Sequence, residues 1–373
     1  MNKIWLSSPH LTGEEQKYVK EAFDTNWVAP LGPNVNGLEQ DLCKFTDAKA
    51  CSALSSGSAA IHLALILLGI EQDDEVLCSS FTFSATANPI RYQKAIPVFI
   101  DSERDTWNMS PELLEKAIKD RISKGKKPKA VLLVHLYGMP AKMKEIIAIA
   151  NQYEIPIIED AAEAMGAFYD SRHMGTFGEM GVFSFNGNKI ITTSGGGALI
   201  SNNPEYCKKA TFLATQARDE APHYQHSEIG YNYRMSNIVA GIGRGQMEVL
   251  QDRVKARRKN FDFYKSALSG LDISFVEEPE GTYANRWLTT ILTDSFESRE
   301  KIRLALEKEN IESRPLWKPM HLQPVFQHFP AYTDGTSEDL FNRGLCLPSG
   351  SNLSREDLER VVDLVATRIK DKG

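Results

Sequence analysis

Short apolar segments alternate with amphipathic ones through the first half of this chain, and this alternation constrains its fold more than any other feature. Buried strands are expected at the apolar segments, residues 76–80, 96–101, 130–135 and 156–159. Helices are expected between them, at residues 85–92, 111–118 and 142–152. Because strands and helices alternate, the sequence predicts an α/β fold with a mainly parallel sheet covered on both faces.

The pattern changes in the last third of the chain. One long helix is expected from Ile238 to about Leu268, followed by a strand at 288–292, a helix at 298–309 and a loop at 313–323. A final helix is expected after Ser354, because Asp357 three residues later completes a sequence typical of a capping box. Since 373 residues exceed the size at which one core keeps growing, we expect a large domain at 1–250 and a smaller one at 251–373.

One lysine lies in a segment suited to covalent chemistry. A strand expected at 182–185 leads into Asn186-Gly187-Asn188-Lys189, and three glycines follow at 195–197. Glycines let the backbone turn sharply and approach a bulky ligand. We therefore expect Lys189 to be a buried amine, because burial favours the neutral form that attacks a carbonyl. The alternative is an ordinary solvated loop lysine.

Asp160 closes an apolar run that begins at Ile155. A carboxylate at the C-terminal end of a buried strand points into the crevice where open α/β sheets bind ligands. The alternative is a helix N-cap, because Asp before Ala-Ala-Glu also suits a helix start. Together, Lys189 and Asp160 would supply the two fixed contacts that pyridoxal 5'-phosphate (PLP) needs, at its aldehyde carbon and its pyridine nitrogen.

A phosphate site is expected at Ser55-Ser56-Gly57-Ser58, which opens an apolar helix at 61–68. Free N–H groups at a helix N-terminus bind phosphate without a basic side chain. Ser184 could add a hydroxyl from the lysine-bearing segment. Phe83 could place its ring against the pyridine, although a core position is its alternative.

Five motifs occur in a characteristic order: Ser-Gly-Ser-Ala near 57, Phe-Thr-Phe at 81, Glu-Asp-Ala-Ala at 159, Ser-Phe-x-x-x-Lys at 184 and Gly-Tyr-Asn-Tyr-Arg at 230. In this order they resemble the DegT/DnrJ/EryC1/StrS family of sugar aminotransferases, and the likeness covers nearly the whole chain. The resemblance implies the aspartate aminotransferase fold (fold type I), with a mainly parallel seven-stranded sheet in a large domain and a smaller α+β C-terminal domain. It also implies a PLP enzyme, usually a homodimer, that aminates nucleotide-linked keto sugars.

The resemblance also assigns roles to individual residues. It implies Lys189 as the Schiff-base lysine and Asp160 as the partner of the pyridine nitrogen. The other cofactor-binding residues that it implies are Phe83 on the ring, Gly57, Ser58 and Ser184 at the phosphate, and Asn232 reaching that phosphate from the second subunit. Glu163 stands near the cofactor where many relatives carry His or Gln.

The substrate is indicated by a narrower likeness. The run Asn186–Lys189 and the segment Thr215–Arg218 before His223-Tyr224 resemble the transaminases of the bacillosamine pathway. This likeness implies L-glutamate as amino donor and UDP-2-acetamido-2,6-dideoxy-4-keto-glucose as acceptor, aminated at C4. Arginine can hold phosphate and aromatic rings can stack on a base or sugar. Candidate substrate-binding residues are therefore Arg234, Arg314, Trp317, Lys318 and His321, although salt bridges or core packing would explain them equally well.

Composition limits the partners and the compartment. A net charge of -6 without a dominant basic run argues against nucleic acid as the main partner. Five scattered cysteines without a Cys-x-x-Cys indicate neither a disulfide framework nor a zinc site, and no metal is expected. The chain shows no signal-peptide core and no apolar run long enough to span a bilayer, so we expect a cytoplasmic protein without a membrane partner.

Three other functions compete with this one. The acceptor could be a dTDP- or GDP-linked keto sugar of the perosamine type. A PLP-dependent dehydratase of the same fold is disfavoured, because the family's C3 dehydratases replace the lysine with histidine. A non-catalytic protein that binds PLP or a nucleotide sugar would have no need of the lysine, the carboxylate and the phosphate contacts together.

Overall fold

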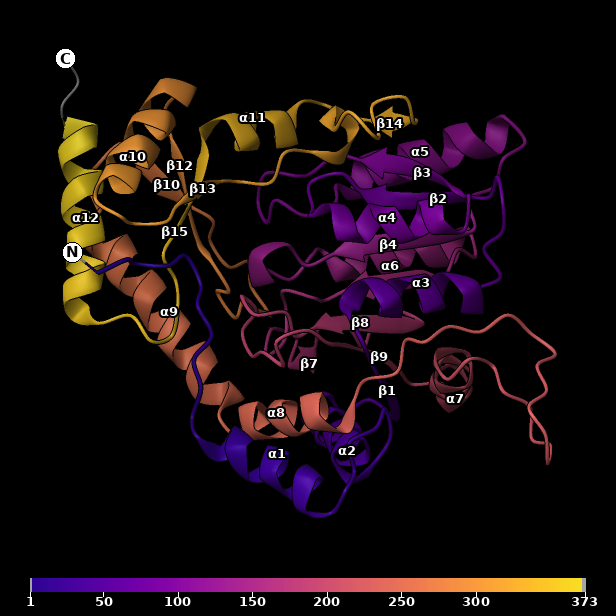
Figure 1. The fold of residues 1–373 in the computed structure, drawn as a ribbon. Helices are drawn as coiled ribbons and strands as arrows, with labels where there is room; N and C mark the ends of the chain where they lie inside the picture. The colour runs from indigo at the N-terminus through magenta and orange to yellow at the C-terminus, as the bar shows by residue number, and fades with distance from the viewer. Residues whose placement is uncertain (1, 371–373) are drawn as a thin grey trace.

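The computed structural model describes residues 2–370, which form two main sheets with helices packed around them (Figure 1). The larger sheet has eight strands in the order β1-β9-β8-β5-β4-β2-β3-β14. Their bounds are β1 Ala50–Leu54, β2 Glu75–Ser79, β3 Ile96–Ile100, β4 Ala130–Val134, β5 Ile157–Asp160, β8 Met180–Ser184, β9 Gly197–Ser201 and β14 Ala331–Tyr332.

The large sheet is mainly parallel. β2 pairs in parallel with β3 and β4, β4 with β5, β5 with β8, and β3 with β14, whereas β9 runs antiparallel to β1 and β8. Every residue of β2 and β4 is buried, which is typical of parallel strands covered on both faces. The carboxyl ends of β4, β5 and β8 lie at one edge, so the side chains that follow these strands come together there.

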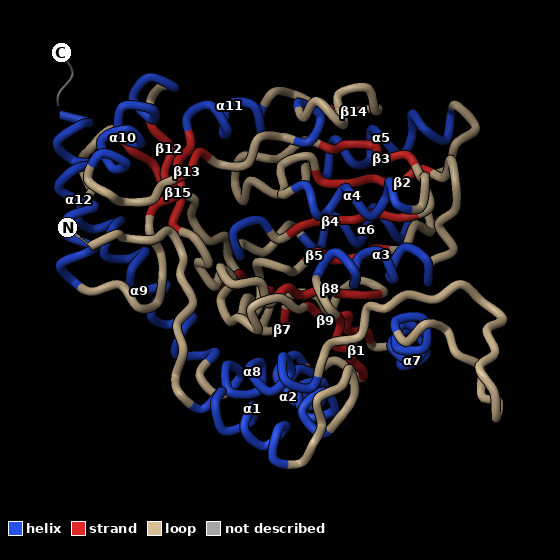
Figure 2. Tube along the Cα trace, viewed as in Figure 1, coloured by secondary structure: helices blue, strands red, loops and turns tan. Residues whose placement is uncertain are grey.

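Helices cover both faces of this sheet (Figure 2). Along β2, Val76 and Cys78 belong to one apolar core, and Leu77 between them belongs to the other, as the two-residue period of a strand requires. The first core includes residues of α3 Gly57–Leu67, α4 Ser84–Tyr92 and α7 Pro204–Ala214. The second includes residues of α2 Pro33–Thr46, α5 Pro111–Ser123 and α6 Met143–Gln152.

The C-terminal part builds a smaller antiparallel sheet in the order β10-β12-β15-β13. Its strands are β10 Ile273–Phe275, β12 Thr289–Thr293, β13 Arg314–Pro315 and β15 Gly344–Leu347. Around it lie α10 Phe296–Lys308, α11 Thr336–Arg343 and α12 Arg355–Lys370. The capping box is confirmed, since the Asp357 N–H donates to Ser354 Oγ at 3.1 Å and the Ser354 N–H donates to Asp357 Oδ2 at 3.2 Å.

Three further helices and a third, small sheet complete the described chain. The helices are α1 Glu14–Asp24, α8 Asn237–Met247 and α9 Leu250–Ala267. The small sheet is ordered β11-β6-β7, with β6 Phe168–Tyr169, β7 Arg172–His173 and β11 Thr282–Tyr283. Two 3₁₀ turns are η1 Leu136–Gly138 and η2 Met320–Leu322. None of the helices between residues 2 and 370 is both long and apolar enough to cross a bilayer.

The expected mainly parallel sheet is confirmed, with the short β14 as an eighth strand at its edge. The four strands expected at 76–80, 96–101, 130–135 and 156–159 agree with the structure to one residue at either end.

The expected long helix is wrong, because Val249 adopts non-helical angles (φ -117°, ψ 7°) and separates α8 from α9. This break lets α9 leave the large sheet and run towards the smaller one (Figure 1). The loop expected at 313–323 contains β13 and η2. The domain division at residue 250 stays a prediction.

Candidate active site

A cavity of about 260 Å³ opens where β5 and β8 end beside the first turn of α3. Its position follows from the topology, because ligands of open α/β sheets bind outside the carboxyl ends of the strands. The structure brings these predicted residues to its wall: Gly57, Ser58, Phe83, Asp160, Glu163, Ser184, Lys189 and Trp317.

The first turn of α3 forms one wall of the cavity. Ser56 caps the helix, since its Oγ accepts the Ala59 N–H at 3.0 Å. An α-helix leaves its first N–H groups without intrahelical partners, and here the remaining ones in the first turn belong to Gly57 and Ser58. A Cβ at Gly57 would lie 3.2 Å from the Ser184 Cβ, so the backbone of α3 lies directly against the end of β8. This turn can therefore present N–H groups to an anion in the cavity.

Asp160 is the last residue of β5, and only 5% of its surface is exposed. Its Oδ2 accepts the Thr86 hydroxyl at 2.7 Å, and its Oδ1 accepts the Ala162 N–H at 3.1 Å. The Thr86 Oγ1 also lies 2.8 Å from the Thr82 Oγ1. Two donors thus fix the orientation of the carboxylate. The helix-cap alternative is wrong, because residues 161–167 form turns.

Lys189 projects its amine between a carboxylate and an indole ring. Its Nζ lies 3.6 Å from Glu163 Oε1 and 4.1 Å from the centroid of the Trp287 ring. The side chain is 13% exposed, as a cavity-facing lysine should be, and the alternative of a solvated loop lysine is wrong. Glu163 is fixed at its other oxygen, where Oε2 accepts the Tyr137 N–H at 2.6 Å. Burial raises the pKa of Glu163, although the neighbouring Lys189 opposes this shift.

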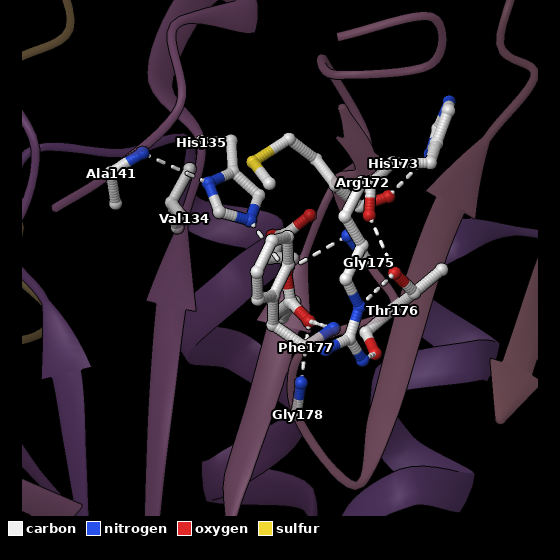
Figure 3. A network of polar contacts seen from close by, with 12 residues as sticks. Val134, His135, Ala141, Arg172, His173, Gly175, Thr176, Phe177 and Gly178 are labelled. Atoms are coloured by element: carbon white, nitrogen blue, oxygen red, sulfur yellow. Dashed lines mark hydrogen bonds and ion pairs between the residues drawn. The ribbon is translucent and has the colours of Figure 1, made fainter. Parts of the chain in front are cut away.

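The buried Glu159, next to Asp160 in β5, forms hydrogen bonds with two other segments of the chain. Its carboxylate accepts the His135 Nε2–H at 2.9 Å and the backbone N–H groups of Gly175, Phe177 and Gly178 at 2.6–2.8 Å. In Figure 3, dashed lines mark these hydrogen bonds, with His135 on one side of the network and Gly175 on the other. Burial alone would raise the pKa of Glu159, but these hydrogen bonds outweigh it and lower the pKa below its usual range. A charged Glu159 therefore holds β4, β5 and the 175–178 turn together beside Asp160.

The mouth of the cavity is aromatic. Phe83 is 51% exposed, and its ring lies 5.2 Å from that of Trp317. Tyr137 stacks between Trp317 and Trp287, with centroid distances of 6.0 Å and 6.2 Å. The Tyr137 hydroxyl also accepts the backbone N–H of Trp317 at 2.9 Å. Flat apolar faces are therefore available beside Lys189 and Asp160.

Four predicted substrate-binding residues lie outside this cavity. Arg234 pairs with Glu39 and donates to the Ala53 carbonyl at 3.0 Å. Arg314 is exposed and pairs with Glu312 at 2.9 Å. Both arginines thus pair with carboxylates of this chain, and neither lines the cavity that holds Lys189.

The other two lie on the segment that carries Trp317. Lys318 is exposed to solvent. The His321 Nδ1 lies 2.6 Å from Ser80 Oγ, and its Nε2 lies 3.1 Å from Glu338. His321 thus anchors this segment to the end of β2. For these four residues, a contact with substrate stays a prediction.

Asn232 is exposed and does not line this cavity. That position is compatible with its expected role, since it was assigned to the cavity of a second subunit. The role stays a prediction.

Three residues of the site were not foreseen. Thr86 could have been proposed from the sequence, because it lies on the helix expected directly after Phe83. Tyr137 and Trp287 come from a 3₁₀ turn and from a segment before β12, and neither is close in sequence to a cavity motif. No spacing in the sequence indicates their contact with Glu163 and Lys189.

The side chains present fit PLP. Lys189 can bond to its aldehyde carbon, Asp160 can pair with its ring nitrogen, and the first turn of α3 with Ser184 can hold its phosphate. The backbone of Gly197 packs closely against the first turn of α3, since a Cβ at Gly197 would lie only 2.4 Å from the Gly57 nitrogen. This close packing supports the assignment of that turn as the phosphate site.

Comparison with known proteins agrees with this fit. A model of the DegT/DnrJ/EryC1/StrS aminotransferase family matches residues 9–366. A Bacillus subtilis protein named as the pyridoxal phosphate-dependent aminotransferase EpsN is 55% identical over 97% of this chain and 95% of its own. The GDP-perosamine synthase of Escherichia coli O157:H7 is 36% identical over the full length of both chains.

Solved structures are also similar. A DegT DnrJ EryC1 StrS aminotransferase from Brucella abortus has a TM-score of 0.90 at 30% identity, covering 96% of this chain and 95% of its own. The PLP form of a protein described as a sugar aminotransferase from Streptococcus pneumoniae has a TM-score of 0.92 at 25% identity, covering 99% of both chains.

Proposed function

We propose a specific sugar substrate for this chain, which belongs to the DegT/DnrJ/EryC1/StrS aminotransferase family and is a PLP-dependent sugar aminotransferase. In this proposal it moves an amino group from L-glutamate to the C4 ketone of a nucleotide-linked 4-keto-6-deoxy hexose, UDP-2-acetamido-2,6-dideoxy-4-keto-glucose. The observation that carries the proposal is the convergence of Lys189, Asp160 and the first turn of α3 on one cavity. The choice of sugar rests on the bacillosamine-type motif at Asn186–Lys189.

The residues of the cavity divide the chemistry between them. Bound PLP supplies a ring that accepts the negative charge left when a proton leaves the carbon beside the substrate nitrogen. Lys189 would hold the cofactor and would also serve as the general base that removes this proton and later returns it. Asp160 keeps a proton on the ring nitrogen, and the Thr86 hydroxyl keeps the Asp160 carboxylate in place. Ser184 and the first turn of α3 hold the phosphate.

A second candidate acceptor is a GDP-linked keto sugar. Its support is the 36% identity to a protein named GDP-perosamine synthase, over the full length of both chains. The aromatic mouth formed by Phe83 and Trp317 suits the flat face of either sugar or either base. The two candidates differ in the base and in the group at C2 of the sugar.

An absorbance cycle tests the proposal. The purified yellow protein is treated with excess glutamate until its visible band is lost, and glutamate is removed. UDP- and GDP-linked 4-keto-6-deoxy sugars are then added to separate samples. We expect the band to return faster with the UDP-linked N-acetyl sugar, and no change in a Lys189→Ala control at either step. A faster return with the GDP-linked sugar would replace the first candidate by the second.

The assembly and compartment belong to the same proposal. A homodimer with shared active sites would bring Asn232 of each chain to the phosphate of the other. A cofactor-loaded monomer in sedimentation experiments would contradict it. The five free cysteines agree with a reducing compartment such as the cytoplasm.

A further inference from the structure

The amine of Lys189 occupies a small site built by other residues of this chain. One side of the site is the face of the Trp287 ring, 4.1 Å from Nζ, and the other is Glu163 Oε1 at 3.6 Å. The face of an indole ring carries partial negative charge and attracts a cation. A carboxylate does the same at the opposite side. The amine thus lies where a positive charge is stabilised.

Trp287 is held rigidly in this position. It is 1% exposed, and its Nε1–H donates to the carbonyl of Asn188, the residue before Lys189, at 2.7 Å. Its own carbonyl accepts from the buried Arg257 at 2.6 Å. Its ring stacks on Tyr137 with an angle of 22° between the planes. The indole therefore moves with the segment that carries the lysine.

Glu163 also contacts Tyr137, the residue that stacks on Trp287. Its Oε2 accepts the N–H of Tyr137, whose ring stacks on Trp287. The other ionisable groups that interact electrostatically with Glu163 include Asp160, the Tyr137 phenol and the Cys346 thiol. The cation that lies against this carboxylate is Lys189, with its Nζ 3.6 Å from Oε1. The arrangement links both walls of the site through one residue, Tyr137.

We propose that Trp287 and Glu163 form a resting site for the Lys189 amine, which occupies it whenever the lysine is not bonded to the cofactor. The use of this site during turnover rests on the role proposed above for Lys189. After the lysine takes a proton from substrate, it is an ammonium ion on a side chain that is only 13% exposed. The resting site would replace the lost hydration and keep that proton available for return.

Competitive acylation of the cofactor-free protein tests this proposal. Only a neutral amine reacts with acetic anhydride, so the rate of labelling at a fixed neutral pH measures how strongly the site favours the ammonium form. Labelling of Lys189 is read by peptide mass spectrometry against the exposed Lys208, whose side chain is 79% accessible. In Trp287→Leu we expect Lys189 to label about 30-fold faster, the size of a desolvated cation–π contribution.

Trp317→Leu is the matched control. It removes an indole from the same cavity, but that ring stacks on Tyr137 rather than over the lysine. We expect its labelling rate to match the unsubstituted protein. Equal rates in Trp287→Leu and the unsubstituted protein, or an equal acceleration in both variants, would overturn the proposal.

Two milder variants keep the test decisive if Trp287→Leu does not fold. Trp287→Phe retains a weaker aromatic face, and Glu163→Gln removes the opposing charge. Each is expected to label faster than the unsubstituted protein, and unchanged rates in both would overturn the proposal. The assay uses neither cofactor nor substrate. Failure of the glutamate-dependent absorbance cycle would therefore refute the proposed function without altering this result.

Discussion

A single methyl group at Gly197 should weaken cofactor binding, because β9 and α3 touch through their backbones at this point. A Cβ there would lie 2.4 Å from both the Gly57 nitrogen and the Ser56 carbonyl carbon, where ordinary contact begins near 3.4 Å. Neither partner is a flexible side chain, so Gly197→Ala must push the first turn of α3 away by about 1 Å. Overpacking of this kind costs about 1–3 kcal/mol. If that cost falls on the phosphate site, the cofactor Kd rises about 5- to 150-fold.

Gly195→Ala is the control for this prediction. Gly195 lies in the same glycine run and lines the same cavity, but a Cβ at this position would meet no atom within 4 Å. Neither glycine has a positive φ, so alanine is not strained by the backbone at either position. Titration of the cofactor-free proteins with PLP, followed by absorbance, gives both Kd values, and thermal unfolding shows that both variants fold. Equal cofactor affinity in the two variants would refute the reasoning about the phosphate site.

Two further predictions follow from buried polar groups near the site. Burial lowers the pKa of His173 to about 4, so between pH 6.5 and 4 the unfolded chain takes up a proton that the folded one does not. Between pH 7 and 5 the protein should therefore lose about 2 kcal/mol of stability through this group. Urea unfolding at several pH values measures this loss of stability. We expect the loss to be absent in His173→Gln and retained in a variant of the exposed His223. An unchanged pH dependence in His173→Gln would contradict the prediction. Thr86→Val removes the hydroxyl donor from Asp160, and stopped-flow absorbance should show the glutamate half-reaction slowed by up to about 100-fold. Thr86→Ser should keep most of that rate, and equal rates in the two variants would show that the hydroxyl does not orient Asp160.

The parts of this molecule that sequence could predict are those set by local patterns. Strands such as β2 and β4 are continuous apolar runs because both of their faces are buried, and this pattern needs no knowledge of neighbours. The polar residues that follow such strands could be placed at one edge by topology alone. That argument located Asp160 and Lys189 at the cavity.

Other features depend on partners that are distant in sequence. The ion pair of Arg234 could not be predicted from the sequence, because its partner Glu39 lies 195 residues away. The indole against Lys189 comes from Trp287, whose hydrogen bond to the carbonyl of Asn188 joins residues 99 positions apart in the sequence. The helix break at Val249 was also invisible, because the alternation of polar and apolar residues continues through it.

The central claim is that Lys189 holds the cofactor covalently, and reduction followed by peptide mapping tests it most directly. The purified yellow protein is treated with sodium borohydride, which fixes any carbon–nitrogen double bond between the cofactor and a lysine, and then digested and examined by mass spectrometry. The account predicts the added mass on the peptide containing Lys189 and on no other. Cofactor attached to a different lysine, or no attachment in a protein that is yellow, would contradict it.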